Sequence, residues 1–273
     1  MIVEQNIKFE TFEKLPESLK GFFKTIKKEL PEILPDILVG IYVYGSISYN
    51  AFDPKRSDVD VAAIIKRKLN EEEIQKLTNW YQTKQMKSNK WISRLEMDFI
   101  TLENITTNIS NDTETTRFAG NKLKEKANMD GAIMDWENIR SCGIVLYGKT
   151  PDSFIPEINE DSLFEALIDK FENLKQNIPK WQNNDLWSQV FIVTQLCRVI
   201  YALENNGKPI SKKQATQWCK ENSPFQFKDM ISFVLQNINA GGEPTVKIVS
   251  ENLPAFVAYI DKLFSEKTKN QKF

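Results

Sequence analysis

The first half of the chain carries apolar residues at the spacings of helices and strands in turn. From residue 13 to residue 30 they recur every three or four positions, which predicts an amphipathic helix that Pro31 and Pro35 end. A second helix is expected at residues 70–85, with the side chain of Asn70 as its cap. Three apolar runs predict strands, at residues 38–44, 59–66 and 94–102.

The rest of this half is more polar. Residues 103–127 are rich in Asn, Thr and Lys and poor in large apolar residues, so we expect a long mobile loop with at most short helices. A short helix at 132–141 and a strand at 143–148 follow. Gly148-Lys149-Thr150 then punctuates the chain, and we place a domain boundary between residues 150 and 151.

The second half is helical in pattern throughout. Five segments have apolar residues at intervals of three and four: residues 161–176, 185–204, 212–222, 227–239 and 252–267. The fold class predicted is therefore α+β. An N-terminal α/β domain with a mixed sheet, residues 1–150, is followed by a C-terminal helical bundle, residues 151–273.

Composition narrows the possible chemistry. The 36 basic and 37 acidic side chains give a net charge of −1, which provides no field to attract nucleic acid. The chain contains no histidine, so Ser-His-Asp triads and histidine zinc sites are excluded. Any general base must then be a carboxylate, and any catalytic metal must bind oxygen.

Cysteine usage and hydropathy bear on the environment of the protein. Cys142, Cys197 and Cys219 lie far apart in apolar segments, as buried thiols without a disulfide do. No run reaches the roughly 18 apolar residues needed to span a bilayer. The first ten residues lack the pattern of a signal peptide. We expect a soluble, cytoplasmic protein with no membrane partner.

Residues 41–65, IYVYGSISYNAFDPKRSDVDVAAII, join two predicted strands through a polar turn. Asp58 and Asp60 are two positions apart, so on a strand both point to the same face. Two such carboxylates can hold one Mg²⁺, or a pair of ions that clamps a triphosphate. Gly45 lacks a Cβ where a phosphate must approach the backbone, and Ser46 offers a hydroxyl and an N–H to bind it. The pattern indicates nucleotidyl transfer.

The predicted strand at 94–102 adds two carboxylates. Glu96 and Asp98 alternate onto one face, and if this strand pairs with the one that follows Asp58, one of them faces the metal pair. The spacing does not rank the two as general base.

These residues resemble the signature of the nucleotidyltransferase superfamily, in which an apolar strand, Gly-Ser and a spacer precede Asp-x-Asp. The phrase FDPKRSDVDV, and the helical segments DSLFEALIDKF and PISKKQATQW, are most similar to aminoglycoside adenylyltransferases of the streptomycin 3''- and spectinomycin 9-type, a class of antibiotic resistance enzyme. The resemblance implies a nucleotidyltransferase domain at residues 1–150 and a helical domain that binds substrate and nucleotide at residues 151–273, with ATP and Mg²⁺ between them.

The resemblance also implies roles for single residues. Leu95-Glu96 matches the glutamate that acts in the family as catalytic base and metal neighbour. Glu96 therefore joins Asp58 and Asp60 as an expected catalytic residue and metal ligand, and Asp98 is held in reserve.

For the nucleotide, Lys212 in Ser211-Lys212 matches the family lysine that reaches the triphosphate. Ser57 matches a family serine that binds phosphate, although a serine before a strand can equally serve the turn alone. The expected nucleotide-binding residues are Gly45, Ser46, Ser57 and Lys212.

The chain departs from the family where the acceptor binds. The Asp-Glu-Arg-Asn run with which the family grips the drug's amines is replaced by residues 181–187, WQNNDLW, which leaves Asp185 as the only acid. Trp181, Trp187 and Trp218 could line a wall that stacks on a sugar, but we expect at least two of them in the bundle core.

The function implied is a Mg-dependent adenylyltransferase that moves AMP from ATP to a hydroxyl of spectinomycin or streptomycin and releases pyrophosphate. Two alternatives remain open at this stage. One is an enzyme of the same chemistry that modifies a protein side chain. The other is a non-catalytic, antitoxin-like module of the same fold, of which the loss of an aspartate would be the usual mark, and both aspartates are present.

Overall fold

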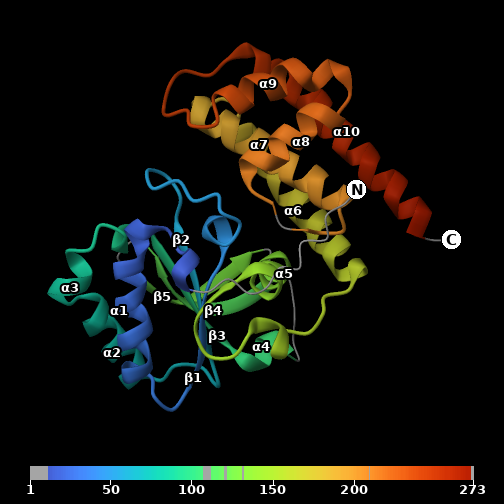
Figure 1. Cartoon of the computed structure of the whole chain (residues 1–273). Coiled ribbons are helices and arrows are strands. Elements are labelled where there is room, and N and C mark those ends of the chain that lie inside the picture. The colour runs from blue at the N-terminus through green and yellow to red at the C-terminus, as the bar shows by residue number, and fades with distance from the viewer. Residues whose placement is uncertain (1–11, 107–111, 120–121, 131, 209, 272–273) are drawn as a thin grey trace. The chain divides into compact units, whose positions relative to one another are not determined.

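The computed structural model describes residues 12–106, 112–119, 122–130, 132–208 and 210–271, so the prediction for the first ten residues lies outside the described part. The chain divides into two compact units, Met1–Ile158 and Asn159–Phe273, where the sequence suggested a boundary at 150/151. Most helices and strands of each unit are labelled in Figure 1.

A six-stranded sheet forms the centre of the N-terminal unit (Figure 1). In spatial order its strands are β5 (Lys122–Asp130), β4 (Asp112–Ala119), β3 (Leu95–Thr101), β2 (Val59–Ile65), β1 (Leu38–Val43) and β6 (Ile144–Tyr147). β2 and β3 are parallel, and the other neighbours are antiparallel. A parallel pair needs a crossover, and here it contains α2 (Glu71–Tyr81) and α3 (Lys84–Lys87). The predicted α+β class with a mixed sheet is confirmed.

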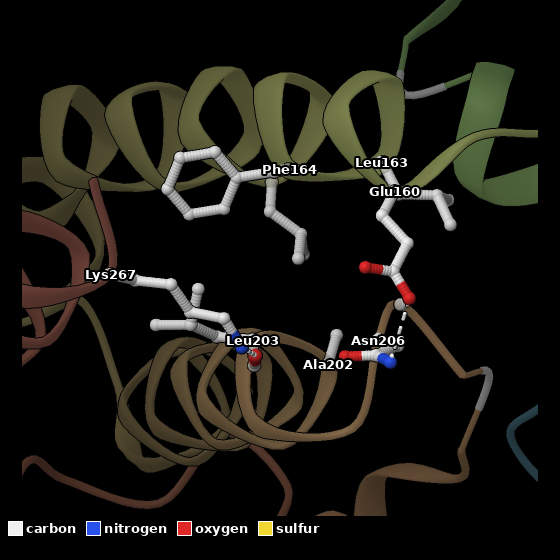
Figure 2. A pocket seen from close by; sticks show the side chains of 9 residues that line it. Glu160, Leu163, Phe164, Ala202, Leu203, Asn206 and Lys267 are labelled. Atoms are coloured by element: carbon white, nitrogen blue, oxygen red, sulfur yellow. Dashed lines mark hydrogen bonds between the residues drawn. The ribbon is translucent and has the colours of Figure 1, made fainter. Parts of the chain in front are cut away.

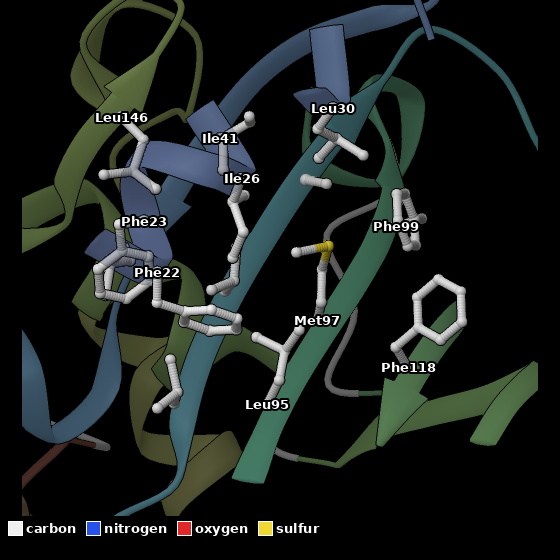
Figure 3. Close-up of a cluster of buried hydrophobic side chains, with 14 of the residues drawn as sticks. Phe22, Phe23, Ile26, Leu30, Ile41, Leu95, Met97, Phe99, Phe118 and Leu146 are labelled. Carbon is white, nitrogen blue, oxygen red and sulfur yellow. The ribbon is translucent and has the colours of Figure 1, made fainter. Parts of the chain in front are cut away.

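One face of the sheet carries the hydrophobic core. The amphipathic helix α1 (Glu17–Ile33) buries Phe22, Phe23 and Ile26 at helical spacing, and they pack against residues of the strands such as Ile41 and Met97 (Figure 3). Burial of each such side chain stabilises the fold by roughly 1.5–3 kcal/mol. This layer fixes which face of every strand points inward.

The opposite face carries the polar side chains. Because side chains alternate along a strand, Tyr42 and Tyr44 lie on the face opposite to core residues Ile41 and Val43. By the same alternation and by the strand register, Asp60, Glu96 and Asp98 share the face of the two tyrosines. The helix α5 (Ala132–Cys142) is hydrogen-bonded to the turn that follows β1, at one end of this polar face.

The loop expected at residues 103–127 was a wrong prediction. The segment contains α4 (Leu102–Thr106) and most of an antiparallel hairpin, β4 and β5. Phe118 is its main anchor in the core, 1% exposed and stacked on Tyr81 with ring centroids 4.5 Å apart. A hairpin at the edge of a sheet buries few large side chains, so its polar composition was mistaken for that of a loop.

Three prolines lie within helices, two of them in the last turn. Pro31 does not stop α1 as predicted; the helix continues to Ile33, and the N–H of Leu34 still bonds the carbonyl of Leu30. Pro179 and Pro254 lie inside two helices of the C-terminal unit.

The C-terminal unit is a helical bundle, as predicted. Its α-helices are α6 (Glu160–Trp181), α7 (Leu186–Glu204), α8 (Lys212–Asn222), α9 (Lys228–Gln236) and α10 (Lys247–Gln271). α7 is long and apolar enough to cross a membrane by length and composition alone, but 78% of its apolar window is buried, as in the core helix of a bundle. All three cysteines are buried and unpaired by disulfides, in agreement with the prediction.

Short 3-10 helices among the described residues are η1 (Phe12–Lys14), η2 (Gly45–Ile47), η3 (Ile92–Arg94), η4 (Pro151–Ser153) and η5 (Phe225–Phe227).

Candidate active site

The turn after β1 brings the chain against the carboxylate of Asp60. Gly45 has a φ of +65°, which favours glycine, and a Cβ placed on it would lie 2.0 Å from Oδ2 of Asp60. Its N–H donates to Oδ1 of Asn138 on α5 at 2.8 Å, and Asn138 is 2% exposed. The turn is therefore held from both sides, and only glycine fits at position 45.

Asp60 and Glu96 lie directly opposite each other on the parallel strands β2 and β3. Burial, followed by the charge of Glu96, raises the pKa of Asp60 to about 8. Burial, followed by the charge of Asp58, raises the pKa of Glu96, while the Arg117 guanidinium lowers it. Three of the residues expected in the site thus act on one another electrostatically, and the sheet register brings two of them side by side.

The hydroxyl of Ser46 is buried and has no hydrogen-bond partner among the described residues. A buried hydroxyl without a partner is uncommon in proteins and calls for an explanation, which a phosphate oxygen at the Gly45 turn would provide. Ser57 is used differently: its Oγ accepts the N–H of Asp53 at 2.9 Å, so it serves the turn before β2. Its own O–H can still be donated, and its role toward a nucleotide stays a prediction.

Asp98 is held inside the protein by groups that the sequence reasoning missed. It is 0% exposed and accepts two hydrogen bonds from Arg117, at 2.7 and 2.9 Å, and one from Thr115 Oγ1 at 2.7 Å. Both partners lie on β4, inside the segment taken for a loop. The β-branched threonines at positions 113, 115 and 116 before Phe118 were the sequence signal that could have revealed the strand, in which Thr113 and Thr115 are buried and Glu114 between them is exposed.

The Arg117–Asp98 ion pair makes the two carboxylates of β3 chemically different. The side chain of Asp98 is neutralised by Arg117, whereas Glu96 is partly exposed and has a raised pKa. A proton acceptor must reach its substrate, so the geometry favours Glu96 over Asp98 as general base.

The donor set fits a magnesium ion. Asp58, Asp60 and Glu96 offer only oxygen, which Mg²⁺ prefers. A cation would relieve their mutual repulsion, which adds to burial in raising the pKa of Asp60 and Glu96. No three acidic or cysteine side chains of the described residues are already arranged as a metal cage, so the identity of the ligands stays a prediction.

The raised pKa of Asp60 leads to a prediction about stability. A carboxyl group whose pKa is higher in the folded protein stabilises the fold at low pH and loses this effect as the pH rises toward its folded pKa. Between about pH 4 and pH 8 the free energy of unfolding, measured with EDTA present, should fall by up to ~1.4 kcal/mol per pH unit through this one group. Asp60→Asn should flatten that slope and be the more stable protein at pH 8. Chemical denaturation of both proteins across this range is the measurement, and equal slopes would contradict the assignment.

In the C-terminal unit, Lys212 is the first residue of α8, and its ammonium lies over the ring of Phe191 at 4.9 Å from the centroid. Trp187 stacks on the same ring at 5.3 Å, and Trp181 meets it edge-on at 5.1 Å. Trp187 is 48% exposed, and Trp181 is partly exposed. Because Trp218 is partly exposed as well, the expectation that at least two of the three tryptophans lie in the core was wrong. Their apolar rings cover the outside of the bundle instead.

Asp185, the only acid in residues 181–187, has a structural role. Its Oδ1 accepts the N–H of Ser188 at 2.7 Å, which caps the N-terminus of α7. The side chain of Ser188 and then its N–H lower the pKa of Asp185. The C-terminal unit also has a small pocket between α6, the end of α7 and α10, in which Glu160 accepts a hydrogen bond from Asn206 and Lys267 bonds the carbonyl of Leu203 (Figure 2). Its walls are mostly apolar and hold no pair of carboxylates for nucleotidyl transfer.

Comparison with known proteins agrees with this geometry. A family model described as a nucleotidyltransferase domain matches residues 23–119, and a model described as the C-terminal domain of aminoglycoside adenylyltransferase matches residues 153–262. Among curated proteins, none matches this chain by sequence. A solved structure with a similar fold is that of the spectinomycin adenyltransferase AAD(9) from Enterococcus faecialis with ATP and spectinomycin. It is 18% identical, with a TM-score of 0.65, and the match covers 94% of this chain and 100% of that one.

Proposed function

We propose that the chain transfers AMP from ATP to a hydroxyl of an aminoglycoside or aminocyclitol. The premise is that it belongs to the aminoglycoside adenylyltransferase family of the nucleotidyltransferase superfamily and is a nucleotidyltransferase. Pyrophosphate is the second product, and spectinomycin or streptomycin is the proposed acceptor. The observation that carries the proposal is the pair Asp60 and Glu96, facing each other beside the Gly45 turn. A cytoplasmic location, where ATP is abundant, belongs to the same proposal.

In the proposed reaction, the site residues of the N-terminal unit have different roles. The backbone at Gly45 and the buried hydroxyl of Ser46 bind the phosphates of ATP. Glu96 accepts the proton of the acceptor hydroxyl, whose oxygen attacks the α-phosphorus while pyrophosphate leaves. Mg²⁺ held by Asp58, Asp60 and Glu96 would neutralise charge on the phosphoryl oxygens and orient the leaving group. Burial and the charge of Asp58 raise the pKa of Glu96; of the nearby ion pair, the Arg117 guanidinium lowers that pKa and the Asp98 carboxylate raises it.

A panel of aminoglycosides and aminocyclitols, each incubated with the protein, ATP and Mg²⁺, tests the proposal. We expect pyrophosphate release that depends on spectinomycin or streptomycin, and a product heavier than the acceptor by one AMP. If no member of the panel causes pyrophosphate release, the result contradicts the proposed function. Labelled ATP and a cell lysate in a parallel reaction report on the protein-modifying alternative, which predicts a labelled protein band.

Lys212 provides a test of the C-terminal unit. If it contacts the triphosphate, as its place in the family motif implies, Lys212→Ala should weaken binding of a non-hydrolysable ATP analogue with Mg²⁺ by roughly 1.5–3 kcal/mol, the range for hydrogen bonds to charged groups. Lys213→Ala is the matched control, because the next residue of a helix points elsewhere. Calorimetric titration gives both affinities. If the two variants bind the analogue equally well, Lys212 has no part in nucleotide binding.

A further inference from the structure

Asp58 is a proposed metal ligand whose backbone is not fixed by strand pairing. The pairing of β2 with β3 begins at Val59 and Leu95, so Asp58 lies just before the first pair, and it is exposed. Ordering such a residue costs conformational entropy when an ion holds it in one place. Metal binding by Asp58 is therefore stronger if another group already holds the backbone at this point.

The turn before Asp58, residues 53–57, is closed on itself. The N–H of Ser57 donates to the carbonyl of Asp53 at 2.9 Å, and the N–H of Asp53 donates to Oγ of Ser57 at 2.9 Å. The N–H of Lys55 donates to Oδ1 of Asp53 at 2.8 Å. These bonds join the two ends of the turn, so a group that binds the turn also holds the backbone next to Asp58.

Arg94, the last residue before β3, binds this turn through its carbonyl groups. Its Nη1 donates to the carbonyl of Pro54 at 2.7 Å. Its Nη2 donates to the carbonyl of Ser57 and, at 3.4 Å, to that of Asp53. One guanidinium thus contacts both ends and the middle of the turn, and one of these contacts is to the residue that directly precedes Asp58.

The guanidinium is itself held in place. Its Cζ lies 5.6 Å from the centroid of the Trp91 ring, and Trp91 is 3% exposed. Nε1 of Trp91 donates to the carbonyl of Ser18 on α1 at 2.8 Å. Along the chain, Arg94 precedes Glu96 by two residues. Arg94 therefore connects the backbone beside Asp58 to the hydrophobic core and to the strand that carries Glu96.

We propose that Arg94 is a positioning residue of the metal site, which holds the backbone beside Asp58 so that less free energy is needed to order its carboxylate on the ion. The inference rests on the proposed function, because it concerns the Mg²⁺ site of that reaction. A planar guanidinium has five N–H donors in a fixed fork, which suits several carbonyl groups at once, whereas the ammonium of lysine is a compact point charge. The shape of the arginine side chain is what the site uses.

The experiment compares Arg94→Lys and Arg94→Met with the wild type and with Arg67→Lys. Arg67 is a matched control, because it follows β2 at the other end, is exposed and bonds Glu73 and the carbonyl of Lys68. Binding of Mn²⁺ alone, followed by the electron paramagnetic resonance signal of the free ion, should weaken about tenfold in both Arg94 variants and stay unchanged in Arg67→Lys. This is the lower end of the effect of outer partners of metal ligands.

AMP transfer gives a second readout of the same variants. The half-saturating Mg²⁺ concentration should rise by the same factor in both Arg94 variants, while kcat at saturating Mg²⁺ changes less than about threefold. Loss of a positive charge would by itself favour a cation, so weaker binding of Mn²⁺ by Arg94→Met reports on position and not on charge.

Wild-type affinity for Mn²⁺ in either Arg94 variant would overturn the inference. So would loss of the fold in both variants, seen by circular dichroism, because the role of Arg94 would then be structural. A wild-type protein that transfers AMP to no acceptor overturns the proposed function instead. Because Mn²⁺ binding is measured without ATP or acceptor, the two failures are distinguishable.

Discussion

The Asp60→Asn variant is expected to lose AMP transfer by at least about 10³-fold in kcat/KM while it stays folded. Asp60 is one of two adjacent carboxylates at the Gly45 turn, and its removal deprives the phosphoryl group of the cation that stabilises the charge of the transition state. The asparagine has the same shape, and the neutral side chain suits a site in which burial already opposes ionisation. Pyrophosphate release and circular dichroism are the two measurements.

The double variant Asp58→Asn, Asp60→Asn is the decisive control for this expectation. It leaves the strands and the core untouched but removes both carboxylates of the Asp-x-Asp motif. Transfer at a rate near that of the wild type would mean that the reaction does not pass through this site, and the proposed function would have to be abandoned.

The second large effect is expected at Glu96. If it takes the proton of the acceptor hydroxyl, Glu96→Gln should lower kcat by roughly 10²–10⁴-fold, with a smaller change in affinity for ATP. Single-turnover measurement of AMP transfer separates this loss from slow product release.

Asp98→Asn is the matched comparison, because Asp98 lies two residues along the same strand and on the same face. It should act mainly on stability: loss of one partner of a buried ion pair leaves Arg117 uncompensated, at a cost of about 3 kcal/mol. The folded fraction of this variant should retain turnover. A severe loss of turnover in folded Asp98→Asn, together with a mild effect of Glu96→Gln, would show that the base was assigned to the wrong carboxylate.

The sequence was most informative where one local pattern determined the geometry. The two-residue spacing of Asp58 and Asp60 predicts a shared face on a strand. In the structure Asp60 lies on β2 opposite Glu96, and Asp58 is the exposed residue just before β2 begins, so the shared face of the two aspartates stays a prediction. Gly45 was predicted from a local pattern too, as a place where a phosphate approaches the backbone; in the structure its φ of +65° and the nearby carboxylate of Asp60 account for the glycine, and the phosphate stays a prediction.

Residues that are brought to the site by elements far away in the sequence could not be predicted from a local pattern. Arg117 lies on an edge strand whose polar composition hid it, and its partner Asp98 is set by the β3–β4 register, which no local pattern specifies. Asn138 belongs to a helix of weak amphipathicity. Its contact with the Gly45 turn depends on how the chain returns after the hairpin.

The resemblance to family motifs did not predict the role of every matching residue. Asp185 stands where an acid of the family would bind the acceptor, yet in this chain it caps α7. The tryptophans expected in the bundle core proved to be partly exposed, because a helical repeat of apolar residues does not reveal which side of the helix its neighbours cover.

The edge of the sheet has a consequence for the behaviour of the protein in solution. β5 is an outer strand, and an unpaired outer strand can recruit a strand of another molecule and start aggregation. Lys122, Lys124 and Lys126 are exposed on it at alternate positions, so two such edges brought together would align rows of like charge. The lysines that made this segment look like a loop thus oppose the pairing of β5 with the same edge of another molecule.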